Sequence, residues 1–144
     1  MALIFTRNHY PCARAWEDRI VQIQDDYGDS GAQVRAISSN DPQKYPYDSF
    51  PKMKERALEK GFNFPYLFDE SQEVAGAYGA ERTPEVFVFG KDHLLLYHGT
   101  VDDDYEDPKA VKNHYLRDAL VAALTEEEPT VAETRPVGCT IKWR

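Results

Sequence analysis

The sequence predicts an α/β domain with a central mixed sheet flanked by helices. In the first half of the chain, short apolar runs rich in β-branched and aromatic residues alternate with segments of helical periodicity. Later, two strand-like runs flank a four-residue turn, and an amphipathic run follows them. A βαβ half joined to an antiparallel hairpin and a last helix requires both parallel and antiparallel strand pairing.

The first strand is expected at residues 2–6 and leads directly into a helix. Pro11 suits the first helical position, because its missing N–H would have no intrahelical partner there. Apolar side chains then recur three and four residues apart, at Ala13, Trp16, Ile20, Ile23 and Tyr27. Cys12 therefore falls in the first turn, where unpaired N–H groups and the helix dipole favour a thiolate.

The remaining elements are expected in a simple order. They are a strand at 33–38, a helix from the cap Ser49 to Lys60, an extended piece at 64–68, a short helix after the capping box 69–72 with Val74, Ala77 and Tyr78 inward, strands at 85–89 and 94–98, and a last helix capped by Asp107, begun by Pro108 and ending at Leu124. Residues 1–124 are predicted to form the domain, and residues 125–144 a tail that packs on it.

The composition narrows the class of protein. A net charge of −8 over 144 residues argues against binding to nucleic acid or to anionic membranes. No signal peptide or membrane-spanning stretch stands out. Two cysteines far apart in the sequence do not form a disulfide framework, so a reducing, cytoplasmic location is expected.

The turn after the first strand carries a resemblance to a known family. It reads Arg7-Asn8-His9-Tyr10-Pro11-Cys12. It resembles the turn of thioredoxin-like redoxins grouped with alkyl hydroperoxide reductase and thiol-specific antioxidant proteins, which commonly reads Cys-Asn-His-Cys-Pro-Tyr. Asn8, His9 and Pro11 match, whereas Arg7 and Tyr10 replace both cysteines of the usual pair. The segment 63–67 and the ending 138–143, Gly-Cys-Thr-Ile-Lys-Trp, are also similar to these redoxins.

The resemblance implies a thioredoxin-like fold that lacks the family's N-terminal strand and hairpin. One edge of the strand at 33–38 would then have unpaired backbone groups, and Arg35 would be its only charged residue that opposes pairing with another chain. We expect two copies to pair along that edge as a homodimer. The alternative is that the tail, residues 137–143, or a loop covers the edge.

Cys12 is the candidate nucleophile. Arg7 is expected to stabilise its thiolate and the charge that develops on a bound peroxide, and His9 to assist or only to fill the turn. A second interpretation is equally open, because Cys12 lies one helical turn before Trp16 and so points toward the core, where a buried thiol is inert.

Cys139 has two interpretations as well: it pairs with Cys12 if the tail folds over the helix start, or it is an unpaired tail thiol. The unpaired thiol is the expectation. The resemblance further implies a cis bond between Thr83 and Pro84, and it places these two residues, with Tyr10 and Pro11, at the substrate.

The predicted function is thiol redox chemistry without a cofactor, as an oxidoreductase acting on a peroxide or on a protein or small-molecule disulfide. The competing interpretation is a non-catalytic binding module that has lost its redox cysteines. No metal site is predicted, because the acidic run 102–107 lacks the glycine and distal glutamate of a calcium loop. The histidines show no metal-ligand spacing either.

Overall fold

The structure is a computed structural model that describes the backbone of residues 1–8 and 11–144 and the side chains of residues 1–8 and 15–144. A five-stranded sheet has the order β3-β2-β1-β5-β6, and β4 and β7 form a separate two-stranded sheet. In chain order the elements are β1 (Ala2–Thr6), α1 (Pro11–Gly28), β2 (Val34–Ser38), η1 (Pro46–Asp48), α2 (Phe50–Lys60), β3 (Tyr66–Phe68), α3 (Glu73–Tyr78), β4 (Arg82–Thr83), β5 (Glu85–Phe89), β6 (Leu95–Gly99), α4 (Tyr115–Leu124) and β7 (Cys139–Thr140).

The middle strand, β1, pairs in parallel with β2 and antiparallel with β5. Its five residues are all buried, which explains why it reads as a continuous apolar run rather than an alternating one. The strands β2 and β3 are also parallel, and β5 and β6 form the antiparallel hairpin. The predicted mixed sheet is therefore confirmed.

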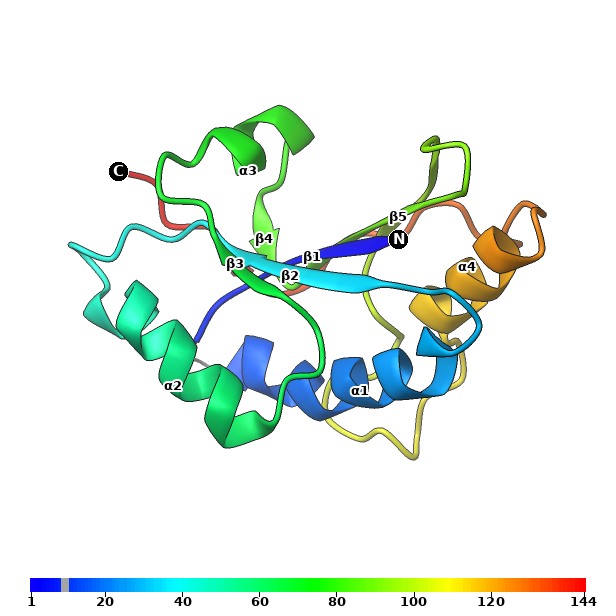
Figure 1. The fold of residues 1–144 in the computed structure, drawn as a ribbon, viewed down its shortest axis with the longest axis horizontal. Coiled ribbons are helices and arrows are strands. Elements are labelled where there is room, and N and C mark those ends of the chain that lie inside the picture. Colours follow the sequence, from blue (N-terminus) through cyan, green and yellow to red (C-terminus); the bar gives the residue numbers. More distant parts are fainter. Residues whose placement is uncertain (9–10) are drawn as a thin grey trace.

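Two apolar clusters cover the two faces of the sheet. Figure 1 shows α1 and α2 below the sheet, α4 beside its right-hand end and α3 above it. The larger cluster lies on the side of α1 and α4 and includes Ile4, Val34, Val86, Trp16, Ile20, Leu116 and Leu120. The smaller cluster lies on the other face and includes Leu3, Phe5, Ile37, Ala75, Phe87 and, from the tail, Ile141.

The expected bare edge on residues 33–38 is wrong, because β2 lies between β1 and β3. The extended piece that follows α2 pairs in parallel with β2, with Ala36 opposite Tyr66 and Ser38 opposite Phe68. The position assigned to a missing strand is thus filled from within the chain. The β2 edge on which the homodimer was predicted is not available.

Two helices differ from their predictions. The last helix begins at Tyr115 rather than Pro108, because carboxylates of the preceding loop accept backbone N–H groups that a helix would use: Asp103 accepts from Lys112 and Asn113. In α3, Ala75 is the buried residue, and Val74 is exposed. Tyr78 packs against the smaller apolar cluster, as predicted, and Gln72 takes the N-cap position in the left-handed conformation.

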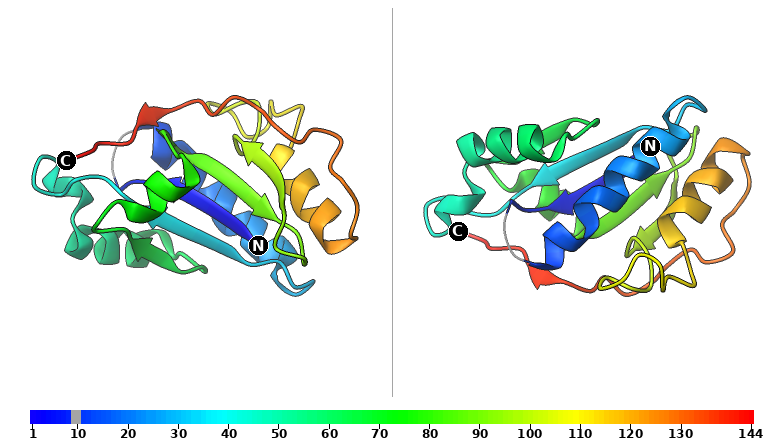
Figure 2. Two further views of the ribbon diagram at one scale, coloured as in Figure 1. Left: turned by 90° about the horizontal axis from the view of Figure 1, so that it is seen from above. Right: turned by 90° about the horizontal axis from the view of Figure 1, so that it is seen from below.

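The tail, residues 125–144, runs back past the hairpin to the opposite end of the sheet (Figure 2). Thr134 fixes it to the domain, since its hydroxyl accepts from the backbone N–H of Thr100 at 3.0 Å and bonds the hydroxyl of Tyr97. Tyr97 is fully buried and donates to the carbonyl of Thr100 at 2.7 Å. Burial raises the pKa of Tyr97 to about 12.

The position of β2 inside the sheet yields a first prediction. Val34→Lys places a charge at a fully buried site and should lower the free energy of unfolding by ~3 kcal/mol or more. Leu67→Lys, on the outer strand β3 and 44% exposed, should cost less than ~1 kcal/mol. Urea denaturation of both variants measures the difference. Equal, small effects would show that β2 lies at an edge.

The buried phenol of Tyr97 predicts a loss of stability at high pH. An unfolded tyrosine titrates near ~10, so above this pH the unfolded chain loses a proton that the folded protein keeps up to about 12. The free energy of unfolding therefore falls, and this one group contributes up to ~1.4 kcal/mol per pH unit in that window. Urea titrations between pH 9 and pH 11.5 (roughly the titration window) should show a steeper decline for the wild type than for Tyr97→Phe. Parallel declines would contradict the assignment.

Candidate active site

The candidate site lies where the carboxyl ends of β1 and β2 meet the loop around Pro84 and the end of the tail. Residues 138–144, here called the strap, cross this edge of the sheet. β7 of the strap pairs antiparallel with β4, so that Arg82 lies opposite Thr140 and Thr83 opposite Cys139. The peptide bond between Thr83 and Pro84 is cis, as the resemblance implied.

Arg7 follows β1 directly and is buried to 2% exposure. Its Nε donates to the Oγ1 of Thr83 at 2.9 Å, and its Nη2 donates to the carbonyl of Thr140. The guanidinium thus joins the end of β1 to both β4 and β7. The sequence predicted an anion-stabilising role for Arg7 and missed this structural one. The one signal for it is a charged residue placed directly after a strand that is buried throughout.

Cys139 is disulfide-bonded in the structure. The expectation that it is an unpaired tail thiol is therefore wrong, because β7 is held against β4 rather than free. The side chains of His9, Tyr10, Pro11 and Cys12 lie outside the described residues, so their predicted roles remain predictions. The backbone of α1 begins at Pro11, as the sequence indicates.

Gly138 allows the strap to approach the loop before β5. A Cβ atom at this position would overlap the carbonyl group of Thr83 and lie 3.3 Å from Cδ of Pro84. Only a residue without a side chain fits this contact. The hydroxyl of Thr83 donates to the carbonyl of Cys139 at 3.3 Å, and Arg82 Nη1 donates to the carbonyl of Gly138 at 3.0 Å.

A buried polar network supports the other side of the site. The carboxylate of Asp48, which is fully buried, accepts from the backbone N–H of Asn8 at 2.9 Å and from Nδ2 of Asn40 at 3.0 Å. Asn40 in turn accepts from the backbone N–H of Lys142, in the strap, at 2.8 Å. The hydroxyl of Tyr66 donates to Oδ1 of Asn8 at 2.8 Å. Burial raises the pKa of Tyr66, with the negative charge of Asp48 adding to the effect, so the phenol remains a donor.

A second buried carboxylate, Glu85, holds the loop before Pro84. One of its oxygens accepts from the backbone N–H groups of Glu81 and Arg82 at 2.9 and 3.0 Å. The other lies 2.7 Å from Nε2 of His98, whose ring stacks on Phe87. Sequence reasoning missed this pair and treated His98 as an unassigned strand histidine. A glutamate directly after Pro84 in an otherwise apolar strand is the signal that marks it.

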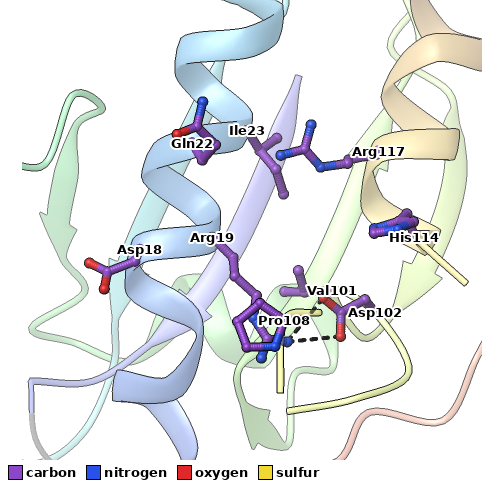
Figure 3. Close-up of a pocket in the computed structure, with 9 residues that line it drawn as sticks. All are labelled: Asp18, Arg19, Gln22, Ile23, Val101, Asp102, Pro108, His114 and Arg117. Atoms are coloured by element: carbon purple, nitrogen blue, oxygen red, sulfur yellow. Dashed lines mark hydrogen bonds and ion pairs between the residues drawn. The ribbon is translucent and has the colours of Figure 1, made fainter. Parts of the chain in front are cut away.

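A hollow of about 290 Å³ lies between α1 and α4 (Figure 3). None of the predicted site residues lines it. Arg19 extends from α1 to the acidic loop, donating to both oxygens of Asp102 at 3.0 Å and to the carbonyl of Tyr105 at 3.1 Å. Burial raises the pKa of Asp102 despite this ion pair. The acidic loop is thus organised by hydrogen bonds within the protein.

Other kinds of site find no support in the described part of the chain. Its His, Cys, Asp and Glu side chains form no group of three or more that is placed to hold a metal ion. Among the helices described, none has both the length and the apolar character needed to cross a membrane.

The packing of the strap predicts a stability effect far from the main helices. Ile141 is 3% exposed in the smaller apolar cluster, so Ile141→Ala should lower the free energy of unfolding by ~2–4 kcal/mol. Val137→Ala, at a position 62% exposed, should change it by less than ~0.5 kcal/mol. Chemical denaturation with the disulfide intact measures both. Equal effects would mean that the strap contributes no core.

The chain is similar in fold and in sequence to proteins of known structure. The chain superimposes on a structure of an uncharacterized conserved protein from Geobacillus kaustophilus with a TM-score of 0.93 and 38% identity, covering 99% of this chain and 76% of that one. A hypothetical protein from Sinorhizobium meliloti 1021 gives 0.92 and 34%, over 99% and 79% of the two chains. A thiol:disulfide interchange protein of the thioredoxin family from Chlorobium tepidum is 16% identical, with a TM-score of 0.65 over 85% and 78%, and shows likeness of fold alone.

Curated proteins gave no significant match. A family model described as AhpC/TSA family matches residues 1–98, the part of the chain that holds the whole five-stranded sheet except the last residue of β6. With its thioredoxin-like fold and this match, the chain belongs to the AhpC/TSA family.

Proposed function

We propose that this protein is a thiol-dependent oxidoreductase whose redox pair is Cys12 and Cys139. The observation that carries the proposal is that Cys139 is disulfide-bonded, in a chain whose one other cysteine is Cys12. Membership of a thioredoxin-like redoxin family supports a general redox role. In this proposal the pair takes the place of the two motif cysteines, which the family has at the positions of Arg7 and Tyr10.

Cys12 is the attacking thiol in this proposal, because it lies in the first turn of α1. The helix dipole and the unpaired N–H groups of that turn favour the thiolate, which is the nucleophilic form. With a hydroperoxide, the thiolate sulfur attacks the outer oxygen, the O–O bond breaks, and a sulfenic acid and an alkoxide or hydroxide result. With a disulfide, it forms a mixed disulfide and releases one thiolate.

Cys139 then resolves the intermediate. Its sulfur attacks the sulfur of Cys12, expelling water from the sulfenic acid once a proton is supplied, or expelling the second thiolate from the mixed disulfide. Each cycle leaves the protein oxidised by two electrons, as the Cys12–Cys139 disulfide. An external dithiol, or two molecules of a small thiol, returns both cysteines to thiols and becomes a disulfide. The thiol-rich cytoplasm supplies such reductants.

A competing function is a non-catalytic binding module. It is favoured by the replacement of both cysteines of the motif and by the buried, structural use of Arg7. The two functions differ in the reactivity of Cys12, which a module of this kind does not need.

Single-cysteine variants test the proposal. The reduced wild type should consume one equivalent of a hydroperoxide or a small disulfide and lose two thiols. Cys139→Ser should still react once at Cys12, leaving a sulfenic acid or a mixed disulfide, and should form no internal disulfide. Cys12→Ser should react at least ~100-fold more slowly, because the remaining thiol is not at a helix N-terminus.

The pH dependence of Cys12 alkylation gives an independent readout. A thiol pKa well below the free value of ~8.5 is expected in Cys139→Ser. Unchanged oxidation in Cys12→Ser, or no internal disulfide by peptide mapping of the oxidised wild type, would overturn the proposal. A Cys12 thiol that resists alkylation until the protein unfolds would favour the binding module.

A further inference from the structure

We propose that the strap is the specificity element of the redox site: it admits small disulfides and hydroperoxides and excludes disulfides held in polypeptide chains. The proposal rests on the function proposed above, because it names the substrate class of the same cysteines. The supporting observation is that residues 138–144 already occupy the strand edge and the hydrogen-bond donors that an extended polypeptide substrate would need.

The strap already occupies the hydrogen-bonding edge of β4, the strand that lies opposite Cys139. β4 is the short strand that pairs with the cysteine-bearing segment, and its partner is β7 of the same chain. One residue further, the backbone N–H of Ile141 donates to the carbonyl of Glu81 at 2.8 Å. A foreign peptide bound by strand addition needs these main-chain groups, and it finds them occupied.

Three side chains also point their donors at main-chain carbonyls of the strap. Arg82, Thr83 and Arg7 donate to the carbonyls of three successive residues, 138, 139 and 140. Donors of this kind recognise an extended backbone without regard to its side chains. They are the groups that would bind a polypeptide substrate here, and the strap satisfies them.

No space remains between the strap and the loop before β5. Gly138 approaches Thr83 so closely that even a methyl group would overlap the carbonyl there. A second chain therefore cannot slip between β7 and β4; it must displace the strap. Small molecules need no such displacement, because they require access to a sulfur atom and not to a strand edge.

The anchors of the strap do not depend on the disulfide. Ile141 is buried in the smaller apolar cluster. The backbone of Lys142 donates to Asn40 and accepts from the N–H of Asp41 at 2.9 Å and from Nε2 of Gln72 at 3.0 Å. The strap thus stays in place when the cysteines are reduced. As a tethered segment it competes at an effective concentration near ~1 mM or above, which a dilute polypeptide does not match.

A pair of activated disulfide probes tests this proposal. One probe is a dipyridyl disulfide, and the other is an extended ten-residue peptide (a length of about ten, ample for strand addition) with a pyridyl disulfide on its central cysteine. Both report their reaction by release of the same chromophore. The background variant Cys139→Ser keeps the strap and leaves Cys12 as the one thiol. In it, the peptide probe should react at least ~100-fold more slowly than the small probe.

Loosening the strap should remove that difference. Adding Ile141→Asp to Cys139→Ser takes away the apolar anchor, and the ratio of the two rates should fall at least ~10-fold, with the small probe little changed. Adding Val137→Asp instead, at an exposed position outside the strap, should leave the ratio unchanged. Gly138→Ala serves as a second loosening variant, and circular dichroism confirms that each variant is folded.

The outcomes separate the two proposals. Equal rates of the two probes in Cys139→Ser, or a ratio that neither loosening variant changes, would overturn the role of the strap and leave the redox pair intact. A Cys12 that reacts with neither probe in any variant would overturn the redox function itself, and the substrate class with it.

Discussion

The guanidinium of Arg7 is the interaction on which the site depends. Burying a cation costs free energy unless protein acceptors replace its water, and Arg7 has such acceptors in Thr83 and in the carbonyl of Thr140. Those two acceptors belong to different segments, β4 and β7. These two hydrogen bonds therefore form together only when β4 and the strap both lie against the end of β1. One buried group thus couples three segments that are distant in sequence.

Buried carboxylates extend the same principle around this edge of the sheet. Asp48 holds the residue after Arg7, Glu85 holds the loop before Pro84, and Asp69 accepts from the backbone N–H groups of Val74 and Ala75 at the start of α3. Each accepts from backbone N–H groups in a loop or at the start of a helix or strand. Buried carboxylates thus hold the backbone of the loops at this site.

The elements that could be predicted from the sequence are those with a strong local pattern. The apolar run of β1, the periodic stripe of α1 and the helix α2 with its cap Ser49 all occur as expected. The place of β3 could not be predicted, because three extended residues carry no sign of their partner. The role of Arg7, the Glu85–His98 pair and the bonded state of Cys139 were missed for a related reason. Each depends on contacts between segments far apart in the chain, and no spacing rule records these.

The contact between Arg7 and Thr140 joins residues 133 positions apart. Closing so long a loop costs more chain entropy than closing a short one. The contacts that offset this cost form only after the sheet between the two residues exists. The strap therefore stabilises the completed fold, because its contact with the residue after β1 exists only once that sheet has formed.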